Sequence, residues 1–159
     1  MTLSAAKRLA PVLILVSFGL DQLSKTWAHS FVGPGNAIAV FPGFNLVAIT
    51  NSGVAFGLAG EAAPAILIAI GVLLSGMLWI WLMRTRSAIH ALGLSLAIGG
   101  ALGNVADRLM FGAVRDFIDL YWDNFHWPSF NLADVAIVAG LGLLVLVGED
   151  QPETSANTS

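Results

Sequence analysis

The chain has 159 residues, of which 57% are hydrophobic and 11% are charged, and its mean hydropathy is +0.80. This composition excludes an ordinary soluble domain and indicates an integral membrane protein. The net charge of −3 without a basic run argues against nucleic acid binding, and because cysteine is absent and the three histidines are scattered, we expect no disulfide, thiolate nucleophile, metal or cofactor.

Four apolar runs predict membrane-spanning helices, because about 20 residues of helix cross a bilayer core of roughly 30 Å. The first, residues 9–28, follows Lys7 and Arg8 as the core of a signal peptide would, but it is longer and contains Asp21 and Lys25. We therefore interpret it as a retained span. The other runs cover residues 64–83, 88–106 and 131–147, the last being short but sufficient if flanking residues anchor it. The predicted fold class is an all-α membrane protein, a single domain over residues 1–159 with four transmembrane helices.

The remaining segments differ in character. Residues 29–63 are rich in glycine and proline around two β-prone pieces, 38–41 and 44–50, and predict a small extracytoplasmic β-rich sheet or lid. Residues 107–130 carry aromatic side chains suited to the headgroup level of a membrane, namely Tyr121, Trp122, Phe125, Trp127 and Phe130. The polar, acidic tail 148–159 is expected to be disordered. Glycines in the spans predict close helix packing, namely Gly71, Gly76, Gly93, Gly99, Gly100, Gly103, Gly140 and Gly142.

Basic residues in short loops indicate which end of each span faces the cytoplasm. By this rule both termini are cytoplasmic and residues 29–63 and 107–130 lie outside, because the inner ends carry Lys7, Arg8, Arg84 and Arg86. Arg108 and Arg115 count against this orientation unless nearby carboxylates hold them.

The ionisable residues of the spans converge at the outer half of the membrane. Asp21 and Lys25 lie in the outer half of the first span, and polar residues also end the third span and begin the fourth. A charge at this depth is costly unless it is paired or hydrated, so such residues are functional candidates. We expect one polar cluster at one level.

Structural roles explain part of this pattern. Asp21 and Lys25 have the spacing of a neutralising i,i+4 pair, and Asp107 can pair with the adjacent Arg108. Asn131 suits an N-terminal helix cap, with Asp134 at the third helical position that the dipole favours. A catalytic dyad of Ser24 and Lys25 is disfavoured, because adjacent residues on a helix point in different directions.

The pattern Asn-x-x-Asp occurs at 104/107 and again at 131/134, and Asp116 lies in the connection between them. Two facing carboxyls cannot both ionise cheaply, so one keeps its proton while the other is charged. Such a pair supplies the acid and the base of aspartic proteolysis. Spacing alone ranks Asp107 as highly as Asp116, and Asp119 receives no role beyond a solvated or capping residue.

Two other function classes fit less well. A small proton-coupled transporter or channel would need polar residues through the full membrane depth, but the second span has no ionisable residue and the inner halves have few. A structural assembly factor would leave both Asn-x-x-Asp patterns unexplained.

The chain resembles the lipoprotein signal peptidase family, signal peptidase II, over residues 9–147. Five motifs in order carry this resemblance: "DQLSK" at 21–25, "NSGVAF" at 51–56, "GNVADR" at 103–108, "VRDFID" at 114–119 and "FNLADVAI" at 130–137. The resemblance implies an aspartyl endopeptidase of the bacterial inner membrane, with its active site near the periplasmic face. It would remove signal peptides from diacylglyceryl-modified prolipoproteins by cutting before the lipidated cysteine.

The resemblance also implies roles for individual residues. Asp116 and Asp134 would be the catalytic pair, and eight residues would bind substrate or support the site: Asp21, Lys25, Asn51, Gly53, Asn104, Asp107, Arg108 and Asn131. Arg115 occupies a variable family position and could lower the pKa of Asp116, so which aspartate holds the proton stays open. The implied partners are the prolipoprotein substrate, membrane lipid and a cyclic lipopeptide inhibitor of the family.

Overall fold

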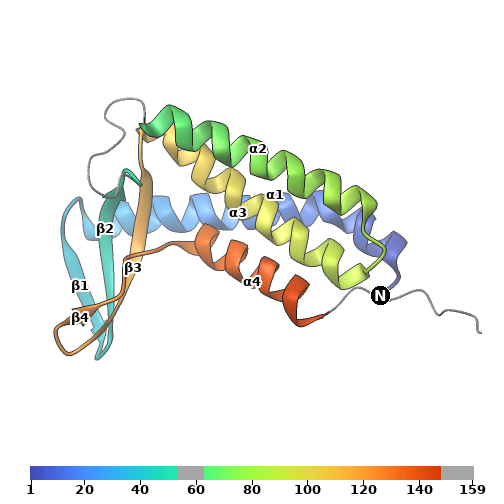
Figure 1. The fold of residues 1–159 in the computed structure, drawn as a ribbon. Coiled ribbons are helices and arrows are strands. Elements are labelled where there is room, and N and C mark those ends of the chain that lie inside the picture. Colours follow the sequence, from blue (N-terminus) through green and yellow to red (C-terminus); the bar gives the residue numbers. More distant parts are fainter. Residues whose placement is uncertain (54–62, 148–159) are drawn as a thin grey trace, which may run out of the picture.

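The computed structural model describes residues 1–53 and 63–147, which form a helix bundle with a small sheet at one end (Figure 1). The helices are α1 (Leu3–Val32), α2 (Ala63–Arg84), α3 (Ala88–Phe111) and α4 (Leu132–Leu146). The strands are β1 (Ala37–Phe41), β2 (Phe44–Asn51), β3 (Val114–Trp122) and β4 (Phe125–His126). The sheet lies at the end of the bundle opposite to the N-terminus.

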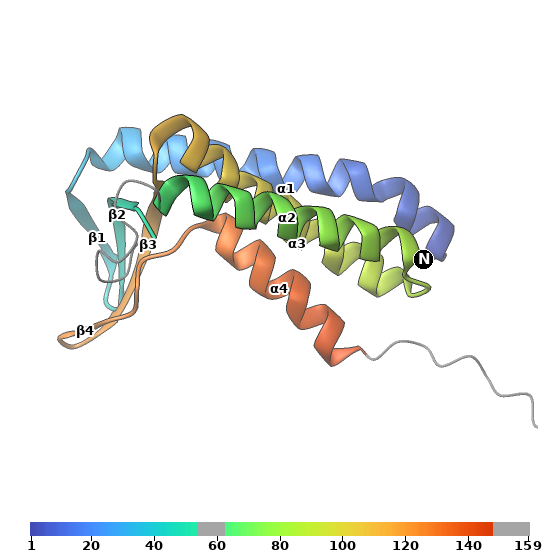
Figure 2. The same cartoon turned by 45° about the horizontal axis from the view of Figure 1, so that its top comes forward.

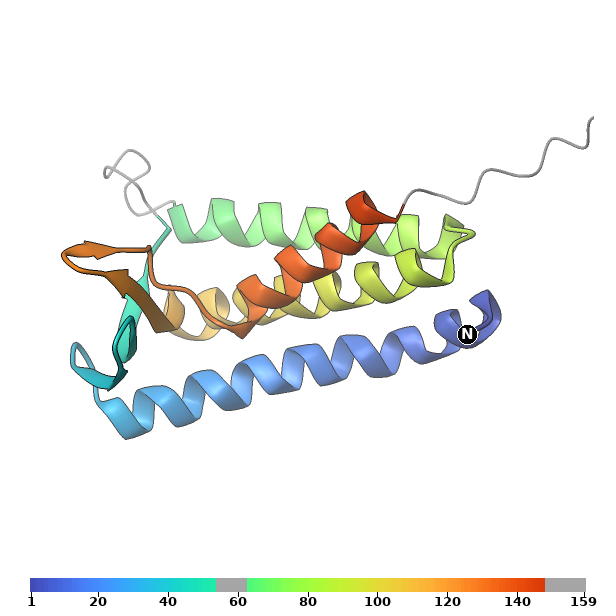
Figure 3. The same cartoon turned by 90° about the horizontal axis from the view of Figure 1, so that it is seen from below.

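Helix α3 is the central element, because it packs against α1, α2 and α4. Helices α1, α2 and α3 are long and apolar enough to cross a membrane, which confirms a multi-pass helical membrane protein. Helix α4 is apolar but has only 15 residues, or about 22 Å of helix, so a fourth complete crossing stays a prediction. Figures 2 and 3 show α4 crossing α3 and diverging from α1 toward its C-terminal end.

Two helices extend beyond the spans that hydropathy predicts. Helix α1 runs past residues 9–28 at both ends, and α3 continues beyond residue 106 to Phe111. Asp107 and Arg108 therefore lie within α3, so the prediction that the helix ends before them is wrong, whereas the outer location of residues 107–130 stays a prediction. Polarity marks the edge of the apolar run, but the helix itself ends only where Gly112 adopts the left-handed conformation at φ 73°.

The sheet has the antiparallel order β1-β2-β3-β4. Strands β1 and β2 match the two β-prone pieces, whereas β3 falls in a segment predicted only as an aromatic connection. The first residues of β3 are buried on both faces, so the strand lacks the alternation that marks a half-exposed strand. Its register with β2 pairs Asp116 with Ile49 and Val114 with Asn51.

Glycines allow α3 to approach its neighbours. A Cβ at Gly93 or at Gly140 would run into the backbone of the other helix, and a Cβ at Gly100 would meet the carbonyl oxygen of Ala133. By contrast, Cβ positions at Gly76 and Gly142 have nothing within 4 Å among the described residues, so a packing role for these two is wrong. The close approach brings the first turn of α4 against α3.

Candidate active site

Asn131 connects the carboxyl groups of Asp116 and Asp134. As predicted, it caps α4: its side-chain Oδ1 accepts from the main-chain N–H of Asp134 at 3.1 Å. Its main-chain N–H donates to Asp134 Oδ2 at 3.3 Å. Its remaining side-chain group, Nδ2, donates to Asp116 Oδ1 at 2.6 Å. A single buried residue therefore sets the start of α4 and joins the two carboxyls.

Asp116 is buried in β3, with 2% of its surface exposed. Its Oδ2 accepts from Asn51 Nδ2 at 3.0 Å, and its main-chain oxygen accepts from His29 Nε2 at 3.1 Å. Burial raises the pKa of Asp116, the hydrogen bonds from Asn51 and Asn131 oppose this, and the charge of Asp134 adds to the increase. The net direction is upward, so Asp116 keeps a proton more readily than an exposed aspartate.

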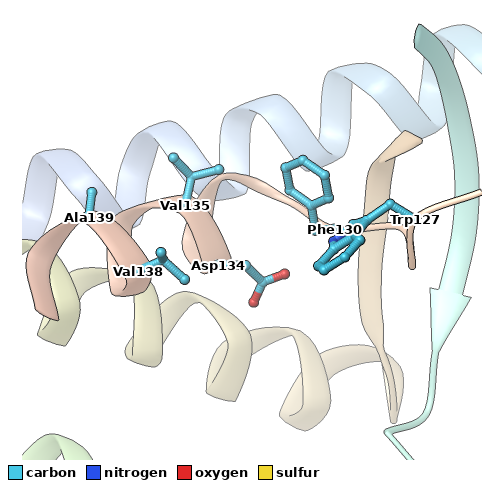
Figure 4. A pocket seen from close by; sticks show the side chains of 6 residues that line it. All are labelled: Trp127, Phe130, Asp134, Val135, Val138 and Ala139. Carbon is cyan, nitrogen blue, oxygen red and sulfur yellow. The ribbon is translucent and has the colours of Figure 1, made fainter. Parts of the chain in front are cut away.

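Asp134 lies in a different environment. It is half-buried, and its Oδ1 accepts from Asn104 Nδ2 at 2.8 Å. It lines an otherwise apolar groove of about 430 Å³ that runs along α4, shown in Figure 4 with the other lining residues Trp127, Phe130, Val135, Val138 and Ala139. One carboxyl of the pair is thus enclosed, while the other meets an open apolar groove.

The i,i+4 pair of Asp21 and Lys25 is present and fully buried, with Lys25 Nζ at 2.8 Å from Asp21 Oδ2. Lys25 also donates to Asn104 Oδ1 at 2.9 Å, and Asn104 in turn donates to Asp134. Asp21 Oδ1 accepts from the amide of Ala133 at 2.9 Å, and a Cβ at Gly103 would collide with the Asp21 carboxylate. This pair therefore ties α1 to α3 and to the first turn of α4.

Asp107 forms its ion pairs with distant residues rather than with its neighbour Arg108. Its carboxylate lies 2.9 Å from Arg115 Nη2 and 3.4 Å from Lys25 Nζ. The predicted local pair with Arg108 is therefore wrong within the described residues. Asp107 is thus held by two cations, whereas the carboxyl of Asp116 accepts from the neutral amides of Asn51 and Asn131.

Asn51, Gly53 and Arg108 lie together near the end of β2. Asn51 Oδ1 accepts from the amide of Gly53 at 2.9 Å, and Gly53 has a φ of 71°. A Cβ at Gly53 would stand 3.5 Å from Arg108 Nη2, and the guanidinium is within electrostatic reach of Asp134 and Asp116. Residues 54–62 of the predicted lid lie outside the described residues.

Two polar residues near Asp116 make contacts that differ from the prediction. Arg115 binds Asp107, Gln22 and Thr26, so its expected effect on the neighbouring Asp116 is replaced by contacts on the other face of the strand. Asp119 is buried and accepts from Asn45 and His126, which corrects its prediction as a solvated or capping residue. The contacts of Arg115 and Asp116 with α1 have a signal in the sequence, namely the helical spacing of positions 22, 26 and 29.

Comparisons with known proteins give a consistent result. A family model described as Signal peptidase (SPase) II matches residues 13–148. The chain is 39% identical over 140 residues to a lipoprotein signal peptidase of Anaplasma marginale (strain Florida), which covers 86% of this chain and 81% of that protein. It is 41% identical over 142 residues to a lipoprotein signal peptidase of Shewanella loihica, with coverages of 85% and 82%.

A solved structure described as a bacterial membrane enzyme has a similar fold. The TM-score is 0.78 at 25% sequence identity, and the match covers 86% of this chain and 90% of that one. The family match contains every candidate site residue.

Proposed function

Because the chain belongs to the signal peptidase II family and is a membrane peptidase that acts on prolipoproteins, we propose that it is an aspartic endopeptidase with Asp116 and Asp134 as its catalytic pair. The observation that carries this proposal is the bridge made by Asn131, which joins two carboxyls in unlike environments. Unlike environments let one carboxyl act as acid while the other acts as base.

In the proposed reaction Asp134 is the ionised base and Asp116 is the protonated acid. Asp134 sits in the first turn of α4, where the helix dipole favours a negative charge, and it meets the open groove. It takes a proton from a water molecule whose oxygen attacks the scissile carbonyl carbon, while Asp116 gives its proton to the carbonyl oxygen. When the C–N bond breaks, the proton on Asp134 passes to the leaving nitrogen and Asp116 recovers its own from the hydroxyl.

The groove beside Asp134 suits a membrane-embedded substrate. Its lining is apolar apart from that carboxylate, so an acyl chain or the apolar signal segment can lie against α4 while the peptide bond reaches the pair. We propose that the substrate carries a diacylglyceryl group and is cut before the modified cysteine. The exposed Gly53 and the neighbouring half-buried Arg108 would hold its main chain, since a guanidinium offers several hydrogen-bond donors.

The same arrangement supports an orientation in the membrane. Lys7 Nζ donates to the carbonyl oxygen of Met83 at 2.9 Å, which brings the basic ends of α1 and α2 together at the end far from the sheet. We propose that this end and both termini face the cytoplasm, with the catalytic pair near the periplasmic face of the bacterial inner membrane.

Cleavage of a lipidated prolipoprotein in detergent tests the catalytic pair. We expect Asp116→Asn and Asp134→Asn each to abolish cleavage while the variants keep their thermal unfolding midpoints within a few degrees of the unmodified protein. Asp123→Asn makes the same change at an exposed turn and should cut normally. Normal cleavage by either pair variant contradicts the assignment, and equal cleavage of a substrate lacking diacylglyceryl contradicts the proposed substrate.

A further inference from the structure

Helix α1 presents a second polar stripe to the back of β3, distinct from Asp21 and Lys25. Gln22, Thr26 and His29 follow the i, i+4, i+7 spacing of one helix face. Each of them bonds to residue 115 or residue 116 of β3. The stripe therefore contacts the part of the strand from which the Asp116 side chain projects.

Arg115 is the centre of these contacts. Its main-chain amide donates to Asp107 Oδ2 at 2.9 Å, and its Nη2 donates to Asp107 Oδ1 at 2.9 Å. The guanidinium also donates to Thr26 Oγ1 and Gln22 Oε1, each at 3.2 Å, and lies 4.3 Å from the ring centroid of Phe111. Both the main chain and the side chain of this residue are fixed to α3 and α1, with the side chain 10% exposed.

The next residue, Asp116, is also fixed through its main chain, because His29 donates to its carbonyl oxygen. Its side chain points to the opposite face of the strand from that of Arg115, where Asn51 and Asn131 receive it. Contacts from α1 and α3 thus fix the backbone of residues 115 and 116, while Asn51 and Asn131 fix the Asp116 carboxyl on the other face of the strand.

Charge balance indicates how Arg115 acts. The buried cluster behind Asp116 contains two carboxylates, Asp21 and Asp107, and two cations, Lys25 and Arg115. The charge of Arg115 is therefore compensated by Asp107, and its fork geometry matches that carboxylate. This arrangement favours an effect through position rather than through the field at Asp116.

We infer that Arg115 is a positioning residue, which locks the start of β3 onto α1 and α3 and so sets the direction of the Asp116 carboxyl. This inference rests on the proposed catalytic role of Asp116. Because Arg115 contacts neither the groove nor the carboxyl pair, its loss should change the rate of the chemical step and leave substrate binding intact.

The test compares Arg115→Met and Arg115→Lys with Arg86→Met, which removes an exposed arginine at the far end of the bundle. For Arg115→Met we expect kcat per folded enzyme to fall by about 10- to 100-fold, the usual scale for a misplaced catalytic group, with KM unchanged. Arg115→Lys keeps the charge but loses the fork, so its kcat should lie between those of Arg115→Met and the unmodified enzyme. The limbs of the pH–rate profile should stay in place, and Arg86→Met should behave as the unmodified enzyme.

Two results overturn the inference: an unchanged kcat per folded enzyme, which indicates a purely structural role, or a displaced pH limb with an unchanged plateau, which indicates a field effect. If Arg115→Met does not fold, Thr26→Val decides, since it removes one acceptor of the guanidinium and should lower kcat by about two- to tenfold. Asp116→Asn in the same assay separates the two proposals. An active Asp116→Asn refutes the catalytic assignment, whereas an inactive one beside a normal Arg115→Met refutes the positioning role alone.

Discussion

Asn131 combines two roles that are usually separate, because its Oδ1 caps a helix while its Nδ2 binds a candidate catalytic carboxyl. Serine can replace the capping oxygen but cannot reproduce the amide donor. The two roles can therefore be separated by substitution.

We expect Asn131→Ala to remove most activity and to lower stability by about 1 kcal/mol for the lost cap, with a further cost for the lost donor to Asp116. Asn131→Ser loses the same donor but keeps a capping oxygen, so it should be more stable than Asn131→Ala by about 1 kcal/mol and lose as much activity. Thermal unfolding and the cleavage assay, run on the same preparations, measure the two effects. Full activity of Asn131→Ser would contradict a role for the amide donor.

A second residue-scale prediction concerns pH. Burial raises the pKa of Asp116, so the folded chain binds this proton more tightly than the unfolded chain. Its contribution to stability is complete below the unfolded-state pKa and is lost as pH rises through the raised folded-state pKa. If Asp116 is the acid, kcat/KM must fall over the same alkaline window, as a property of the coupled pair.

Asn51→Ala tests whether Asp116 carries this proton, because the side-chain amide of Asn51 favours the ionised form of Asp116 and lowers its pKa. Without that donor the alkaline limb of kcat/KM should move to higher pH, whatever happens to the plateau. Asn124→Ala, an exposed amide in the β3–β4 turn, should leave the limb in place. A limb that moves to lower pH in Asn51→Ala would show that Asp116 does not carry the titrating proton.

At this scale, local spacing predicts only local contacts. The pair of Asp21 and Lys25 and the Asn131 cap both follow from residues three or four positions apart, and both are present. The ion pair of Asp107 with Arg115 depends on the reversal of the chain at Gly112, which no periodicity describes. Long-range pairing therefore required the fold.

Among the elements, β3 shows most clearly why sequence patterns were insufficient. It carries Asp116, and its first residues are buried against α1 and β2. Its polar side chains are typical of a loop in sequence, but in the fold they are buried and hydrogen-bonded. Helices α1 to α3 were predicted, because apolar runs of that length have few alternatives. The candidate site therefore combines helices that hydropathy predicts with a strand that its polar residues made hard to predict.

The contact of α3 with α4 gives a prediction at the element scale. A Cβ at Gly140 would meet the carbonyl oxygen of Gly93 and would lie 2.9 Å from the amide nitrogen of Ala97, so Gly140→Ala should destabilise the protein by about 1–3 kcal/mol. Gly142→Ala is the matched control, because its Cβ meets nothing within 4 Å among the described residues. Thermal unfolding in one detergent should rank Gly140→Ala below the unmodified protein and Gly142→Ala at or above it. Equal midpoints for the two variants would contradict close packing at Gly140.

Across the whole molecule, the buried ion pairs of the described residues lie at one end, beside one of the two apolar clusters, which includes Ala28, Val32, Leu46, Ala48 and Phe117. The end far from the sheet is filled by a cluster of small and aliphatic side chains that includes Ala6, Ala10, Ile14, Leu82 and Leu94. The buried charges gather at the sheet end. A proton relay or channel would need polar groups at both depths, whereas a hydrolytic site approached from one face needs them only here.

The β3–β4 hairpin extends beyond the helices at this end, as Figure 1 shows. Its turn is tight, with Asp123 at a φ of 54°, and it exposes Trp122 by 85%, Phe125 by 67% and Trp127 by 60%. These large aromatic side chains have an apolar body, and tryptophan adds one polar N–H. Such residues are favoured at the headgroup level of a bilayer, which is where the sequence predicts this segment to lie.

A variant that keeps Trp122 and replaces Trp27, Trp79, Trp81 and Trp127 by Phe tests this placement in reconstituted vesicles. We expect lipids brominated at shallow acyl positions to quench Trp122 fluorescence more strongly than deeply brominated lipids, and aqueous iodide to quench it weakly. The matched variant that keeps only Trp27, exposed near the sheet end of α1, reports the lipid-facing side of a span and should be insensitive to iodide. Strong iodide quenching of Trp122 without lipid quenching would place the hairpin in water, and the groove beside Asp134 would then lack an aromatic anchor at the bilayer surface.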